Sequence, residues 1–108
     1  MKVEVLYFEG CPNHAPALEM VRRVLDREKI EAEVRLIEVT DEKVVETVRF
    51  LGSPSVRVDG VDIEPGREGD VPFYGCRTYM VAGETVGVPP EKWLVDALAR
   101  GIRSGPGR

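Results

Sequence analysis

The fold is decided close to the amino terminus, by residues 3–14, which read VEVLYFEGCPNH. Residues 3–8 are mostly β-branched, aromatic or apolar and are followed by the turn signal of Gly10, a pattern that predicts a buried strand. In residues 15–29 the apolar side chains recur at helical spacing, which predicts an amphipathic helix. Cys11 therefore lies at a strand-to-helix junction.

The next elements alternate in type along the chain. Residues 32–39 alternate between apolar and charged side chains and predict a second strand. Residues 43–51 predict a second helix with its apolar face on Val44, Val45, Val48 and Leu51, and Gly52 is expected to end it. The short run 55–58 predicts a third strand.

A hairpin signal follows the third strand. Asp59-Gly60 separates residues 55–58 from 61–63 and predicts a two-residue type I′ turn. Residues 64–75 are rich in glycine and proline and predict an inserted loop, and residues 76–81 are a candidate further strand. Residues 91–102 predict an amphipathic terminal helix.

This order predicts an α/β domain. The first two strands need a helical crossover and are expected to be parallel, whereas the hairpin adds antiparallel strands. A mixed central sheet flanked by helices on both faces is the simplest arrangement. We expect one domain over residues 1–103 and a flexible carboxyl-terminal tail over residues 104–108.

Composition narrows the classes of function. The chain has 108 residues, a formal net charge of −4 and two cysteines. The acidic balance argues against nucleic-acid binding, and no apolar run approaches the roughly 20 residues that span a membrane. The amino terminus lacks the features of a signal peptide, so a cytoplasmic location is expected. Two cysteines there point to redox or metal chemistry.

Three local motifs carry a resemblance to a known family. Gly10-Cys11-Pro12-Asn13-His14 follows the first strand, Ser53-Pro54 precedes the third, and Asp59-Gly60 forms the hairpin turn. With these motifs the chain resembles the thioredoxin-like superfamily over residues 2–64 and 87–102. It is most similar to small bacterial thioredoxin-fold proteins with a Phe-x-Gly-Cys-Pro opening, some of which are labelled alkylmercury-lyase-like.

The resemblance implies a thioredoxin-like fold and a reactive thiol at Cys11. It also implies that Pro54 is cis, so that the backbone before it can bind an extended chain or a mixed-disulfide partner. Pro12, Ser53 and Pro54 are thus candidate substrate-binding residues. The second cysteine of the family motif is replaced by His14, which excludes a dithiol switch within the motif.

The position of Cys11 suggests how its thiol is tuned. Unpaired backbone N–H groups and the helix dipole at a helix amino terminus favour a thiolate. His14, three residues on, is a candidate to stabilise that thiolate as a cation, or to act as a base or metal ligand. The alternative for Cys11 is an inert cysteine packed in the core, and the alternative for His14 is a solvent-exposed helix residue with no functional role.

Two placements of Cys76 are open. If residues 61–63 pair with the third strand, the chain returns to the Cys11 end of the sheet, where Cys76 can approach Cys11. If residues 76–80 are the partner strand instead, Cys76 lies roughly 13 Å away at the far end, beyond disulfide reach. The first placement is preferred because Asp59-Gly60 is a strong turn signal.

Three functions follow as hypotheses, and none requires a cofactor. The first is a thiol-disulfide oxidoreductase acting on a protein or small-molecule thiol or disulfide, with catalytic residues Cys11, His14 and Cys76. The second is binding or transfer of a soft metal ion (mercury, copper or zinc) through Cys11 and Cys76. The third is a non-enzymatic adaptor that binds a partner along its Pro54 edge.

Several other side chains are candidates for supporting roles. The arginines are candidates for a basic rim near the site, and the alternative is ordinary solvated surface charge. The aromatic residues are candidates for anchoring the inserted loop, although core packing explains their spacing better. The two sets are Arg57, Arg67 and Arg77, and Phe73, Tyr74 and Tyr79.

Overall fold

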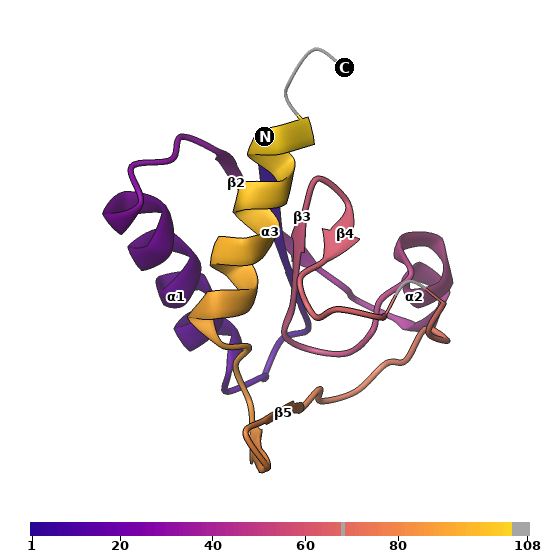
Figure 1. Cartoon of the computed structure of the whole chain (residues 1–108). Helices are drawn as coiled ribbons and strands as arrows, with labels where there is room; N and C mark the ends of the chain where they lie inside the picture. Colours follow the sequence, from indigo (N-terminus) through magenta and orange to yellow (C-terminus); the bar gives the residue numbers. More distant parts are fainter. Residues whose placement is uncertain (68, 105–108) are drawn as a thin grey trace.

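A mixed four-stranded sheet organises the protein (Figure 1). The computed structural model describes residues 1–67 and 69–104. The strands are β1 (Lys2–Tyr7), β2 (Glu33–Glu38), β3 (Ser55–Val58) and β4 (Val61–Asp62), in the order β2-β1-β3-β4. β1 is parallel to β2, and β3 is antiparallel to both of its neighbours. The mixed sheet of an α/β domain is therefore confirmed.

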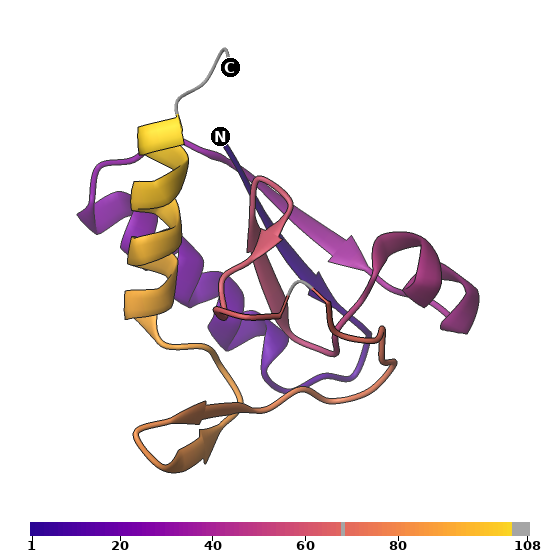
Figure 2. The same cartoon turned by 45° about the vertical axis from the view of Figure 1, so that its right-hand side comes forward.

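Helices lie on both faces of this sheet (Figure 2). α1 (His14–Arg27) and α3 (Glu91–Ser104) pack side by side on one face, and the shorter α2 (Glu42–Val48) lies on the other. Of the expected tail, Ser104 is the last residue of α3, and residues 105–108 lie outside the described residues.

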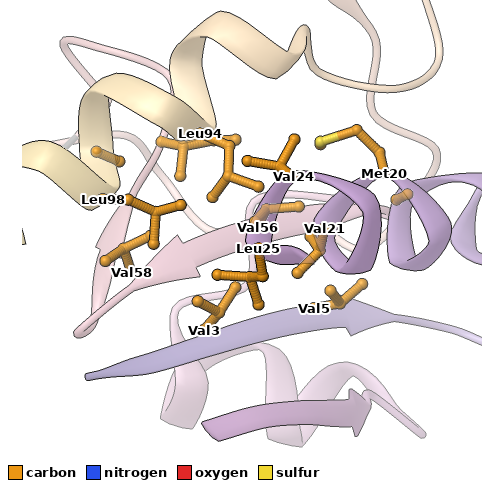
Figure 3. Packing of buried hydrophobic residues seen from close by; sticks show 13 residues of the cluster. Val3, Val5, Met20, Val21, Val24, Leu25, Val56, Val58, Leu94 and Leu98 are labelled. Atoms are coloured by element: carbon orange, nitrogen blue, oxygen red, sulfur yellow. The ribbon is translucent and has the colours of Figure 1, made fainter. Parts of the chain in front are cut away.

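The main apolar core fills the space between the sheet and the helix pair α1 and α3 (Figure 3). Val3 and Val5 of β1 face this core together with Val56 and Val58 of β3, because alternate residues of a strand share one face. The helices contribute apolar residues at helical spacing, among them Val21, Val24, Leu94 and Leu98.

A smaller apolar cluster covers one end of the opposite face. It joins Leu6 of β1 to Val39, Val45 and Phe50 around α2. Phe50 is fully buried although the helical pattern did not assign it to the core. α2 does not reach Gly52 as expected: it ends at Val48, and Arg49 takes the left-handed conformation with φ 53°.

The hairpin prediction is confirmed. Val58 pairs with Val61 across the turn, and Asp59 and Gly60 both have positive φ angles, as a type I′ turn requires. The Ser53–Pro54 peptide bond is cis, as expected.

The chain after β4 takes a path that its local sequence did not indicate. The strand expected from residue 76 begins only at Tyr79, and β5 (Tyr79–Val81) pairs with β6 (Glu84–Val86) in a separate two-stranded sheet. In Figure 2 this hairpin lies apart from the main sheet, below α1 and α3.

Candidate functional site

Cys11 occupies the junction between β1 and α1. Its backbone N–H donates to the carbonyl oxygen of Phe8 at 3.3 Å, which closes the turn at the end of the strand. In the antiparallel register, Leu6 is opposite Ser55, so the end of β1 lies beside the start of β3. The Cys11 turn and the Ser53–Pro54 segment therefore share one end of the sheet.

The amino terminus of α1, which follows this junction, has no side-chain cap. Asn13 makes no side-chain capping hydrogen bond, and the first turn contains no acidic residue. In α2, by contrast, the carboxylate of Asp41 accepts hydrogen bonds from the N–H groups of Lys43 and Val44. The helix dipole of α1 is thus not neutralised locally and favours an anion in front of the helix.

His14 contacts the backbone of Cys11. Its Nδ1 lies 2.8 Å from the Cys11 carbonyl oxygen, and because that oxygen only accepts, Nδ1 carries the proton and donates. The imidazole stacks on the Tyr7 ring with centroids 4.5 Å apart. His14 therefore holds the turn that carries Cys11, and its expected action on the thiol stays a prediction.

Residues 73–88, which we call the strap, run across this end of the molecule. The N–H of Ser53 donates to the carbonyl of Gly75, and the N–H of Arg77 donates to the carbonyl of Ser53, both at 2.8 Å. A Cβ on Gly52, whose φ is +105°, would lie 2.8 Å from the Cβ of Arg77, so only glycine allows this close approach.

Three aromatic residues attach the strap to the domain, one of them through its backbone. The N–H of Phe73 donates to the Phe50 carbonyl at 2.7 Å, and the Tyr74 ring packs 5.4 Å from the Phe8 ring. The buried Tyr79 donates its hydroxyl to the carbonyl oxygen of Pro54.

The Tyr79 hydroxyl is shielded from water. Burial raises the pKa of the Tyr79 hydroxyl well above its usual range, while the positive charge of Arg77 opposes that rise. The carboxylates of Asp62 and Glu64 add to that rise. Cys11 itself is only 3% exposed.

Arg77 holds the strap from inside the protein. It was a candidate for an exposed basic rim, but it is buried, and its guanidinium donates two hydrogen bonds to Asp62 at 2.7 and 2.9 Å. Further bonds go to Glu64 and to the Ser55 hydroxyl, each at 2.9 Å. Burial alone would lower the pKa of Arg77, but these partners raise it above its ordinary value.

The same arrangement separates the two cysteines. The preferred hairpin placement is correct, yet Cys76 does not approach Cys11: both thiols are free and are not near each other. Neighbouring side chains of an extended segment point in opposite directions, so the inward Arg77 leaves Cys76 exposed. The resolving role expected of Cys76 therefore has no geometric support.

The structure gives little support to the expected substrate-binding residues and metal ligands. Pro12 is exposed beside Cys11, whereas Ser53 and Pro54 are buried and the backbone groups of Ser53 are already bonded to the strap. Within residues 1–67 and 69–104, no three histidine, cysteine, aspartate or glutamate side chains gather in a way that could hold a metal ion. The two-cysteine metal site also lacks support, because the thiols lie apart.

The sequence pattern missed the acidic partners of Arg77. Asp62 and Glu64 bracket the end of the hairpin, and their alternate spacing directs both carboxylates to one side. The spacing of the two carboxylates indicated that they could share a cation. The neighbouring sequence did not show that Arg77 is this cation.

Comparison with known proteins adds no relative: no family model, no curated protein and no solved structure matches this chain. None of the helices in the described part of the chain is long and apolar enough to cross a membrane.

Proposed function

We propose that the chain is a thioredoxin-like domain that performs thiol–disulfide exchange through Cys11 alone. The observation that carries the proposal is a free cysteine two residues before Asn13, the N-cap of a helix that has neither a side-chain cap nor an acidic first turn. A helix amino terminus attracts negative charge, and the thiolate is the nucleophilic form of cysteine.

The topology supports the thioredoxin-like part of the proposal. A parallel β1-α1-β2 unit is followed by the antiparallel hairpin of β3 and β4, with α1 and α3 on one face and α2 on the other. This is the element order on which the resemblance rests. It brings Cys11 and Pro54 to the same end of the sheet.

The proposed exchange needs one protein thiol and an external one. The Cys11 thiolate attacks one sulfur of a disulfide, so that a new S–S bond to Cys11 forms, the old S–S bond breaks, and the second sulfur leaves as a thiolate. A low-molecular-weight thiolate then attacks the substrate sulfur of the mixed disulfide, so that a new S–S bond joins these two sulfurs, the bond to Cys11 breaks, and Cys11 leaves as a thiolate. Cys76 takes no part, which fits its distance from Cys11.

The strap favours a small substrate. Both backbone groups of Ser53 that would pair with an extended protein chain are bonded to Gly75 and Arg77 instead. A protein partner docking along this edge, as the adaptor hypothesis requires, must first displace the strap. A small-molecule disulfide needs only a brief opening that exposes the Cys11 sulfur.

The two cysteines supply a matched pair of variants for the test. We expect the Cys76→Ser protein to form a mixed disulfide at Cys11 with bis(2-hydroxyethyl) disulfide under native conditions. The rate is expected to be about 10-fold higher than at Cys76 in the Cys11→Ser protein, although Cys76 is the exposed thiol. Intact-mass spectrometry of timed, acid-quenched samples measures both rates.

The same measurement can reject the proposal. An inert core cysteine would form the mixed disulfide only in denaturant, and Cys76 would then be the faster thiol in the native protein. Adding reduced glutathione to the Cys11 adduct should release it, which is the second half of the cycle.

A further inference from the structure

A cavity of about 470 Å³ lies on the face of the sheet that α2 covers only in part. It extends from the end of α2 to the β3–β4 turn and is separate from the Cys11 turn. Its apolar lining comes from Leu6 and Ile37 of the sheet, from Val48 and Leu51 around the end of α2, and from Val61.

The acidic side chains that line the cavity are already engaged. Asp62 receives two hydrogen bonds from the buried Arg77. Asp70 is 3.2 Å from a guanidinium nitrogen of Arg67, and Glu4 is 3.9 Å from the Lys2 ammonium. Little carboxylate capacity is therefore left for the remaining cations of the cavity.

Among residues 1–67 and 69–104, two arginines in the lining have no carboxylate partner. Arg57 donates to the backbone carbonyl of Arg49, and Arg49 donates to the backbone carbonyl of Asp70 at 3.1 Å. Within the described part of the chain neither guanidinium forms an ion pair. A guanidinium has five N–H donors, so most donors of both side chains remain available.

Arg57 is half-buried in the lining of the cavity. Burial lowers the pKa of Arg57; the carboxylates of Asp62 and Glu4 oppose this, and the smaller effects of the positive charges on Arg77 and Arg49 add to it. The side chain stays protonated at neutral pH. An anion beside it would offset the cost of keeping that charge partly out of water.

We propose that this cavity binds a small organic anion, with its carboxylate or phosphate group on Arg49 and Arg57 and its apolar body on Leu6, Ile37 and Val48. Planar guanidinium groups bind such anions through paired hydrogen bonds. The volume falls within the range of small-molecule sites, and the apolar lining gives the ligand body a surface to bury. This site is independent of the thiol chemistry at Cys11.

Phenyl phosphate is a suitable probe because it combines a phosphate with an apolar ring. We expect it to shift the backbone amide signals of residues 47–51 and 57–62 saturably in a nuclear magnetic resonance titration. A dissociation constant of about 1 mM or tighter is reasonable for a ligand of this size. Benzyl alcohol lacks the charge and inorganic phosphate lacks the ring, so each is expected to bind at least about 10-fold more weakly.

Variants connect the binding to the two arginines. Arg57→Gln and Arg49→Gln are each expected to weaken phenyl phosphate binding about 10-fold. Arg49 is exposed, so its variant remains informative if Arg57→Gln disturbs the fold. The matched control is Arg35→Gln, since Arg35 lies on β2 outside the cavity and pairs with Glu33.

Three results would overturn the proposal. The first is the absence of saturable shifts with phenyl phosphate in the wild-type protein. The second is inorganic phosphate or benzyl alcohol binding as tightly as phenyl phosphate. The third is an equal loss of binding in Arg35→Gln, which would assign the effect to net charge.

Discussion

The two faces of the sheet are built in different ways. Towards α1 and α3, alternate strand residues such as Val5 and Val56 bury apolar side chains in one continuous core. Towards α2, the apolar cluster covers only one end, and the remaining area carries the charged groups Arg57, Asp62 and Arg77. The face towards α1 and α3 stabilises the fold by removing apolar surface from water. The face towards α2 pairs opposite charges, which would be costly to bury without their partners.

This difference predicts how each face responds to the loss of one side chain. An apolar core loses the transfer free energy of the missing atoms together with a cavity term. A buried charge network loses more, because the partners that remain are left unpaired out of water. Single substitutions in both faces therefore test the comparison.

The largest effect is expected from Arg77→Met. Asp62 and Glu64, whose side chains are only 8% and 11% exposed, would lose their shared cation. We expect a loss of about 3–5 kcal/mol in the free energy of unfolding, measured by chemical denaturation. Arg67→Met is the control: Arg67 also bonds to Glu64 but is 44% exposed, so a loss of about 1 kcal/mol or less is expected. Equal losses in the two variants would show that the network is not shielded from water.

A smaller effect is expected from Leu98→Ala on the apolar face. Leu98 is fully buried between α3 and the sheet, and its truncation should cost about 3 kcal/mol. Ile102→Ala, on the same helix but 53% exposed, is the control and should cost about 0.5 kcal/mol or less. The comparison of the two faces fails if Leu98→Ala is more costly than Arg77→Met.

Elements with strong local signals could be predicted from the sequence. The turn at Asp59-Gly60 fixes its own hairpin, and the strand-to-helix switch around Cys11 follows from a change in apolar period. These features depend on neighbours in the chain, which a single sequence displays directly.

The site could be predicted only in part, because its remaining geometry depends on contacts distant in sequence. Arg77 pairs with Asp62, 15 residues away, and the strap bonds to Ser53. The same pairing decides the orientation of Cys76, so neither its exposure nor its separation from Cys11 could be inferred from spacing. Phe50 is buried because the chain turns back at Arg49, which takes the left-handed conformation. An arginine residue rarely adopts this conformation, so the sequence does not indicate the turn.

The smallest expected effect is a pH dependence that arises on the charged face. Burial alone would raise the pKa of the Glu64 carboxyl, but hydrogen bonds from Arg67 and Arg77 outweigh it, so the pKa lies below its ordinary value. A group whose pKa is lower in the folded protein stabilises the fold above its unfolded pKa, and that stabilisation is lost as the pH falls through the folded pKa. The contribution of Glu64 should therefore be complete at neutral pH and decline below about pH 4.5.

The variant Glu64→Gln isolates this contribution, because glutamine still accepts a hydrogen bond but does not titrate in this range. We expect the free energy of unfolding of the wild-type protein to fall more steeply below about pH 4.5 than that of Glu64→Gln. Other acidic groups, including Glu91, whose pKa is also lowered by hydrogen bonds from Arg27 and Arg23, titrate in both proteins and cancel in the difference. Parallel curves would mean that Glu64 gains nothing from its arginines on folding. The charged face would then contribute to stability only through the pairing of Arg77 with Asp62.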